Sequence, residues 1–264
     1  MIIELIGCDG AGKTTLSRIL AEPGFLEGHA VRIADLVLDR PGLRRVTHPT
    51  AMNLVQEVGG MPFLLRAYRR RRPYLSFARR MHGRYAPSTY HRLNGMRGIA
   101  RRVGMYELAR SRAADRVVLS DEGTVLSAYL FALTRVELDR ADVERFAELV
   151  PPPDTIVYVK APIEALVRRA LTRPDGRPQH GGKSRSEVEQ TIERTVDVFD
   201  LVAGASPLRD RVLVVENDRD DQDRLRRLAA DLAAKLRASV PVSSAGARDA
   251  TRAAPDELHV EPRR

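Results

Sequence analysis

The chain has little of several residue types, and each shortage narrows the classes of protein it can belong to. Its 264 residues include one cysteine and no tryptophan. The single cysteine, Cys8, excludes an intramolecular disulfide and a zinc site built from several cysteines. The longest uncharged apolar run, residues 123–134, is far shorter than the roughly 18 to 20 residues of a membrane-spanning helix. The opening MIIELIG lacks the basic start of a secretory signal, so we expect a cytoplasmic protein.

Acidic residues are missing from one long segment. Residues 58–106 contain no Asp or Glu, yet they hold twelve arginines and seven aromatic residues, in a chain of net charge +9. Such a segment can be a solvated face packed by ordinary aromatics, a pocket for a nucleotide acceptor, or a surface for nucleic acid or an anionic membrane. Four consecutive arginines, residues 69–72, cannot all point from one helix face into one pocket. Some of them must therefore be surface charges.

Short apolar runs alternate with helix-like stretches along the chain. The expected strands are residues 1–6, 30–34, 117–119, 155–159 and 212–215. Expected helices cover residues 16–21, 92–114, 124–133, 139–149, 162–171, 184–202 and 220–238, and Ser184 with Glu187 has the spacing of a capping box. This alternation predicts an α/β fold of three layers, with a mainly parallel five-stranded sheet and helices on both faces.

We expect one domain over residues 1–238 and a disordered tail over residues 239–264, where the composition turns to Ala, Ser, Pro and Arg. Within the domain, the Arg/aromatic-rich segment of about 58–106 is expected to be a helical insert. A Gly/Pro-rich stretch with arginines, about 168–185, is expected to be a lid that closes on phosphates, although a solvated loop is the ordinary alternative. Arg168 and Arg173 are its best candidates for stabilising charge during the reaction.

The strongest motif follows the first expected strand and reads G-C-D-G-A-G-K-T from Gly7 to Thr14. This is the G-x-x-x-x-G-K-T phosphate-binding loop, in which glycines let backbone N–H groups surround phosphate oxygens at a helix N-terminus. Lys13 then bridges the β- and γ-phosphates of ATP, and the Thr14 hydroxyl holds Mg²⁺. The residues expected to bind the nucleotide are Gly7, Gly10, Ala11, Gly12, Lys13, Thr14 and Thr15. Cys8 within the loop is interpreted as a small residue that fits rather than as a reactive thiol.

Two carboxylates, Asp121 and Glu122, follow the expected strand at 117–119. Ligands bind at the carboxyl edge of open parallel sheets, so one carboxylate can hold Mg²⁺ through water and the other can orient an acceptor hydroxyl. A helix N-cap is the ordinary alternative for Asp121. We therefore predict Thr14 and Asp121 as the magnesium residues. His180 is interpreted as a surface loop residue, because no partner lies at metal-binding spacing.

The chain resembles the thymidylate kinase-like group of P-loop nucleotide kinases. The resemblance rests on G-C-D-G-A-G-K-T-T, on V-V-L-S-D-E-G, and on V-Y-V-K-A-P-I-E-A-L-V-R-R-A-L-T-R. It implies that Asp9, at the third loop position, meets the acceptor, and that the loop after residues 212–215 lies near the donor adenine. The sequence departs from the group at two places. Glu122 stands where the group usually has an arginine, and Asp39-Arg40-Pro41-Gly42 matches the group's Arg-Glu-Pro-Gly motif only in part.

The resemblance implies a P-loop NTPase fold and a Mg²⁺-dependent phosphoryl transfer from ATP to a nucleoside monophosphate, with dTMP favoured. Lys13, Asp9, Asp121, Arg168 and Arg173 are its expected catalytic residues. One alternative is a P-loop kinase acting on a nucleoside, a sugar or a polynucleotide end, which Glu122 and the basic segment favour. Another is a nucleotide-dependent regulatory module that binds nucleic acid or membrane. The expected partner is a small nucleotide substrate, and a homodimer is compatible with the sequence.

Overall fold

Five short apolar segments pair side by side in the computed structural model, which describes residues 1–26, 29–38, 48–113, 116–132, 136–172, 184–218 and 221–239. They are β1 (Ile2–Ile6), β2 (His29–Arg32), β3 (Arg116–Ser120), β4 (Thr155–Lys160) and β5 (Val212–Glu216). The strand order is β2-β3-β1-β4-β5, and every pair is parallel. The predicted five-stranded parallel sheet is confirmed. Because β1 is central, the loop that follows it emerges between β3 and β4 at the carboxyl edge.

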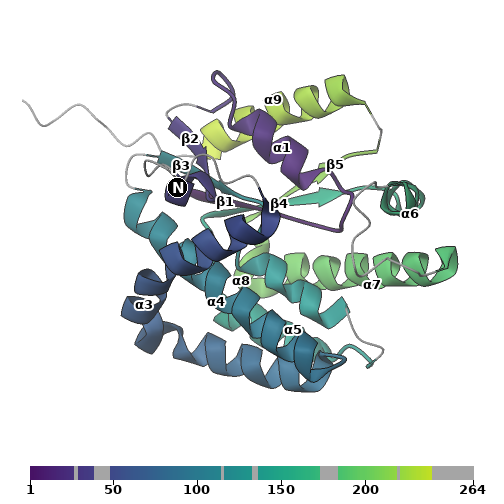
Figure 1. Ribbon diagram of the computed structural model, residues 1–264. Coiled ribbons are helices and arrows are strands. Elements are labelled where there is room, and N and C mark those ends of the chain that lie inside the picture. Colours follow the sequence, from purple (N-terminus) through teal and green to yellow (C-terminus); the bar gives the residue numbers. More distant parts are fainter. Residues whose placement is uncertain are drawn as a thin grey trace, which may run out of the picture.

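Helices cover both faces of the sheet (Figure 1), and alternating side chains of β1 pack against the two layers of helices. Ile3 and Leu5 are fully buried in a cluster with residues of α1 (Lys13–Leu20) and α9 (Gln222–Ser239). Ile6 points to the opposite face and joins a cluster with residues of α3 (Pro49–Tyr85), α4 (Thr89–Arg112) and α7 (Arg185–Gly204). The sheet therefore forms the middle of three layers, as the alternation of strands and helices predicts.

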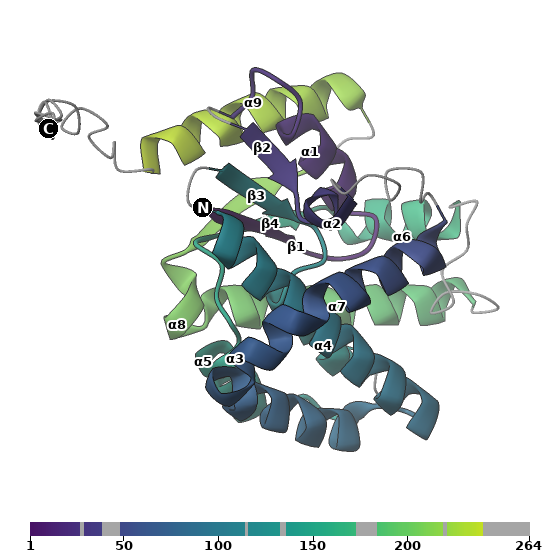
Figure 2. The same cartoon turned by 60° about the vertical axis from the view of Figure 1, so that its left-hand side comes forward.

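The Arg/aromatic-rich segment forms most of two long helices, α3 and α4, which pack against each other. Their closest approach uses two glycines: a Cβ on Gly104 would lie 2.7 Å from the carbonyl oxygen of Gly60. Pro62 and Pro73 lie inside α3, and α3 changes direction along its length (Figure 2). The basic segment is helical, and α3 begins at Pro49, before this segment starts. That the segment is an insert stays a prediction.

The other described helices are α2 (Asp35–Leu38), the 3-10 helix η2 (Val125–Ala132), α5 (Arg140–Leu149), α6 (Ile163–Leu171) and α8 (Ser206–Arg209). The bounds of α5 and α6 match expected helices, whereas the short helices α2 and α8 were not predicted. The capping box of Ser184 and Glu187 is present at the start of α7. Pro162 is the N-cap of α6 rather than its first residue. Residues 124–133 were expected as an ordinary helix, but within the described part of this segment the backbone is 3-10.

Three expectations from the sequence lie outside the described residues: the partial motif at 39–42, most of the lid with Arg173 and His180, and the tail from residue 240 onward. In the parts of the chain that are described, no helix is both long and apolar enough to cross a bilayer.

Candidate active site

The loop after β1 has the backbone conformation that only glycine adopts easily. Gly7, Gly10 and Gly12 have φ values of 132°, 84° and 97°. At Gly7 a Cβ would lie 2.3 Å from the carbonyl oxygen of Val159 in β4, so no side chain fits there. Gly12 is the N-cap of α1, which directs the unpaired N–H groups of that helix toward the loop. The segment therefore has the geometry of an anion cradle at a helix N-terminus.

The Lys13 side chain lies back over the loop. Its ammonium Nζ donates to the carbonyl oxygens of Gly7 and Cys8, each at 2.8 Å. These contacts keep the charge over the loop, where an arriving phosphate can replace the carbonyls. Cys8 itself is buried, and burial raises the pKa of its thiol to about 12. The thiol is therefore protonated at neutral pH, which agrees with its interpretation as a small packing residue.

Two residues distant in the sequence support the loop from outside. The buried side-chain amide of Asn217, just after β5, donates from Nδ2 to the carbonyl oxygen of Ala11 at 2.9 Å. Arg169 of α6 donates from Nη1 to the carbonyl oxygen of Gly10 at 3.0 Å. Its neighbour Arg168, the residue predicted to act on the phosphates, is exposed on the same helix. The segment after β5 was expected near the donor adenine, but its Asn217 contacts the phosphate-binding loop directly.

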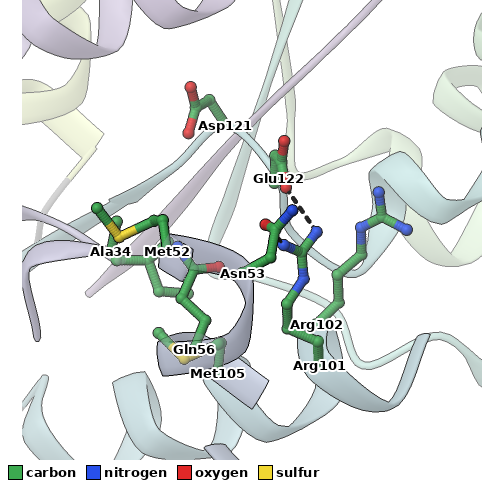
Figure 3. Close-up of a pocket in the computed structure, with 10 residues that line it drawn as sticks. Ala34, Met52, Asn53, Gln56, Arg101, Arg102, Met105, Asp121 and Glu122 are labelled. Atoms are coloured by element: carbon green, nitrogen blue, oxygen red, sulfur yellow. Dashed lines mark hydrogen bonds and ion pairs between the residues drawn. The ribbon is translucent and has the colours of Figure 1, made fainter. Parts of the chain in front are cut away.

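Asp121 and Glu122 lie directly after β3, at the same edge of the sheet as the loop. Register places Glu4 of β1 opposite Ser120 of β3, so Asp121 follows at the level where β1 approaches Gly7. Glu122 forms an ion pair of 2.8 Å with Arg101 of α4, and Arg101 also contacts the side-chain oxygen of Asn53 (Figure 3). Glu122 occupies the position where the resembled family carries an arginine. The guanidinium beside it belongs to Arg101, which comes from α4.

A cavity of about 250 Å³ opens beside these carboxylates. We call it the Asp121 cavity; its lining is Ile33, Ala34, Met52, Asn53, Gln56, Arg101, Arg102, Met105, Asp121 and Glu122 (Figure 3). A second cavity of about 740 Å³, here the His82 cavity, shares Asn53, Arg101 and Arg102 with it and extends between α3 and α4 to His82 and Tyr90. The volume of the His82 cavity suits a small-molecule ligand, whereas the Asp121 cavity is slightly smaller than usual for one. Asp9, predicted to meet the acceptor, is half-buried in the loop and is not among the residues that line either cavity.

Several polar groups near the shared wall of the two cavities are buried. Burial, together with the nearby Arg102 and Arg92 guanidinium groups, lowers the pKa of His82 to about 4, so His82 is neutral at pH 7. Burial also lowers the pKa of Arg102, and its Nε has no hydrogen-bond partner among the described residues. On β1, Glu4 is buried and accepts from the backbone N–H of Leu126 at 2.7 Å. Burial raises the pKa of Glu4 to about 7.

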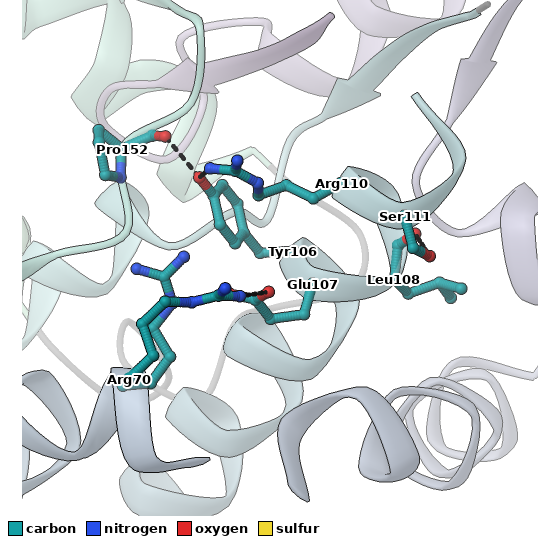
Figure 4. Close-up of polar contacts among 8 residues, drawn as sticks. Arg70, Tyr106, Glu107, Leu108, Arg110, Ser111 and Pro152 are labelled. Carbon is teal, nitrogen blue, oxygen red and sulfur yellow. Dashed lines mark hydrogen bonds and ion pairs between the residues drawn. The ribbon is translucent and has the colours of Figure 1, made fainter. Parts of the chain in front are cut away.

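Nine of the twelve arginines in the basic segment fall into three groups. Arg70 and Arg71 of α3 both pair with the buried Glu107 of α4, and the Arg71 guanidinium also lies 5.4 Å from the ring centre of Tyr106 (Figure 4). These two arginines join the helices. Arg97, Arg101 and Arg102 line the His82 cavity. Arg66, Arg69, Arg72 and Arg79 are exposed on α3. The segment therefore combines a structural role, a cavity wall and a solvated face, and its binding of nucleic acid or membrane remains a prediction.

The residues predicted to hold Mg²⁺ fit that ion by their chemistry. Magnesium usually takes one or two protein oxygens and completes its shell with water and substrate phosphates. Thr14 is exposed at the start of α1 and Asp121 is half-buried at the end of β3, so both oxygens are at the loop's edge of the sheet. In the described ranges no three His, Cys, Asp or Glu side chains gather into a closed metal site. The assignment of Mg²⁺ to Thr14 and Asp121 stays a prediction.

No protein-family model and no curated protein matches the chain. Among solved structures it is similar to thymidylate kinase from Candida albicans, with 12% identity and a TM-score of 0.47, over 89% of this chain and 92% of that one. It is also similar to deoxyadenosine kinase from M. mycoides, solved with bound dCTP, with 14% identity, a TM-score of 0.44, and coverage of 90% and 100%. It is similar as well to shikimate kinase from Bacteroides thetaiotaomicron, with 14% identity and a TM-score of 0.43, over 90% of this chain and 98% of that one.

Proposed function

We propose that the protein transfers the γ-phosphoryl group of ATP, with Mg²⁺, to a nucleoside monophosphate, with dTMP as the favoured acceptor. The observation that carries the proposal is the loop from Gly7 to Thr14. Three glycines with positive φ precede a helix N-terminus, and Lys13 lies over the loop at the edge of the sheet where Asp121 and its cavity open. A nucleotide's phosphates and a second substrate can thus meet at one place.

Each residue of the site has a role in this proposal. The loop amides bind the donor phosphates, and Lys13 exchanges its two carbonyl contacts for phosphate oxygens as charge develops there. Thr14 and Asp121 hold Mg²⁺, which neutralises phosphate charge when it is bound. Asp9 orients the acceptor. Arg169 fixes the loop at Gly10, and Arg168 supplies positive charge from α6. Arg173 is proposed to supply positive charge as well.

A second candidate is a P-loop kinase whose acceptor is not a nucleoside monophosphate. Glu122 favours it, because a carboxylate stands in the Asp121 cavity where the resembled family has an arginine. Arg101 compensates for that change in part, since its guanidinium lies 2.8 Å from Glu122 in the same cavity. The local charge therefore remains compatible with a phosphorylated acceptor.

A coupled assay of ADP release across nucleoside monophosphates, nucleosides, sugars and polynucleotide ends separates these candidates. We expect the highest kcat/KM with a nucleoside monophosphate. Lys13→Ala should lower turnover by at least about 100-fold while leaving the far-UV spectrum and Tm unchanged. Lys235→Ala is the matched control, because Lys235 is exposed on α9, away from the loop. Retained phosphoryl transfer by Lys13→Ala would reject the assigned role.

A further inference from the structure

One buried carboxyl group, that of Glu4, lines neither cavity but lies close behind the carboxylates of the site. Glu4 is the middle residue of β1, where the other four residues are buried and apolar, and it is 1% exposed. Burying a carboxyl group in such surroundings is costly unless its oxygens are hydrogen-bonded. In the sheet, Glu4 lies opposite Ser120, the last residue of β3. It is therefore at the level where the chain leaves β3 and enters Asp121 and Glu122.

The hydrogen bonds of this carboxyl group go to the turn that directly follows the two carboxylates. Its Oε1 accepts from the backbone N–H of Leu126 at 2.7 Å, and its Oε2 lies 3.4 Å from the Thr124 hydroxyl. A Cβ on Gly123 would overlap Cδ of Glu4, so the Gly123 backbone lies flat against the carboxyl group. The Thr124 hydroxyl donates in turn to the carbonyl oxygen of Pro151 at 2.6 Å. The turn is thus wrapped around one buried side chain.

Glu4 therefore holds the chain on both sides of the two carboxylates. Before them, Ser120 is fixed in the sheet beside the Glu4 backbone, and after them Gly123 lies against the Glu4 side chain. Only Asp121 and Glu122 lie between these two points, so the directions of their side chains depend on the turn. Figure 3 shows the two carboxylates pointing in different directions.

We propose that Glu4 is a positioning residue, which fixes the turn after β3 so that the Asp121 carboxylate keeps its orientation at the edge where Mg²⁺ is proposed to bind. The inference rests on the proposed function. Glu4 acts through the backbone of residues 123–126 rather than on the reacting groups. Replacing a residue that orients a metal ligand commonly changes metal affinity or activity by about 10- to 100-fold.

The test compares wild type with Glu4→Met, Glu4→Gln and Leu232→Ala. Met keeps an unbranched side chain and removes both oxygens, whereas Gln keeps an oxygen that can accept from the Leu126 N–H. Leu232 of α9 is buried in the cluster on the opposite face of the sheet, so Leu232→Ala controls for lost stability alone. Each protein is assayed for ADP release with dTMP over a range of Mg²⁺ concentrations, and ATP binding at saturating Mg²⁺ is measured by calorimetry.

We expect Glu4→Met to lower kcat by at least about 10-fold and to raise the Mg²⁺ concentration for half-maximal rate by a similar factor. Glu4→Gln should recover most of both losses. Leu232→Ala should lower the Tm while keeping both kinetic values. The affinity for ATP should stay close to that of wild type in every variant, because the turn lies outside the loop that is proposed to hold the donor phosphates.

Amide hydrogen exchange on the protein without nucleotide gives a readout that does not depend on turnover. Glu4→Met should lose protection in the turn of residues 123–126, because the N–H of Leu126 loses its acceptor, while β1 and β4 keep their protection. Glu4→Gln should keep protection in the turn as well.

Normal kcat and Mg²⁺ dependence in Glu4→Met, or unchanged protection of the turn, would overturn the inference while leaving the kinase proposal standing. Equal losses of kcat in Glu4→Met and Leu232→Ala, or a loss of protection spread over the whole sheet, would assign Glu4 to stability alone and overturn it too. Wild type that phosphorylates no acceptor would overturn both the inference and the proposed function.

Discussion

A single carboxyl group on the central strand gives the protein a pH dependence that can be calculated. Glu4 lies on the same face of β1 as Ile2 and Ile6, and it is 1% exposed. Its carboxyl accepts from the N–H of Leu126, and the Thr124 hydroxyl lies 3.4 Å from its other oxygen. These contacts and the charge of Arg102 lower its pKa, but burial dominates and raises it from the ordinary 4.5 to about 7. Glu4→Gln keeps the shape and removes the ionisation.

The magnitude follows from linkage. One pH unit of pKa displacement corresponds to about 1.4 kcal/mol, so a rise from 4.5 to about 7 amounts to about 3 kcal/mol. The folded state binds the proton more tightly than the unfolded state does. The stabilisation is therefore complete below pH 4.5, declines as the pH rises, and is lost above about 7. Between pH 5 and pH 8, Glu4→Gln should gain about 2 to 3 kcal/mol of unfolding free energy relative to wild type.

Urea unfolding at half-unit intervals from pH 5 to pH 8 measures this difference. Contributions from other groups, including the buried His82, cancel because wild type and variant share them. Glu144→Gln, an exposed carboxylate of α5, is the control for a change in net charge. Parallel stability curves for wild type and Glu4→Gln would refute the reasoning, because they would mean that Glu4 keeps its ordinary pKa in the folded protein.

Two further predictions concern glycines. Gly12→Ala should weaken ATP binding by at least about 10-fold in calorimetry. The backbone φ of Gly12 is 97°, and the new Cβ would lie 2.7 Å from Nδ2 of Asn217, which would disturb the support of the loop. Gly24→Ala controls for backbone strain alone, because Gly24 has a similar φ of 95° and its Cβ would meet nothing within 4 Å. Gly104→Ala should lower stability by about 1 to 3 kcal/mol in urea unfolding, because its Cβ would force α3 and α4 apart. An unchanged urea midpoint for Gly104→Ala would contradict the close crossing of these helices.

The strands and the loop could be predicted from sequence because their signals are local. Each strand is a short apolar run, and the loop's glycines and Lys13 follow one of those runs within eight positions. The position of Asp121 at the carboxyl edge of the sheet could also be predicted, because the carboxyl ends of parallel strands lie at the same edge. The 3-10 form of η2 did not follow, since its apolar residues suit either helix type.

The supports of the site could not be predicted, because they join residues far apart in the chain. Asn217 reaches Ala11 across 206 positions, and nothing in the sequence near either residue indicates the contact. The geometry of a helix correctly indicated that some of the four consecutive arginines must lie outside any pocket. Helix geometry and charge counting have a limit, however. They could not indicate that Arg70 and Arg71 would share Glu107, the first acid after the acid-free segment.

Binding of Mg²⁺-ATP by titration calorimetry tests the central claim most directly. The account predicts saturable binding with one nucleotide per chain for wild type and Lys235→Ala, and a loss of at least about 10-fold in affinity for Lys13→Ala. Absence of measurable heat with wild type at every purine triphosphate tried, or equal affinity in Lys13→Ala, would contradict the claim that the loop from Gly7 to Thr14 holds the donor phosphates.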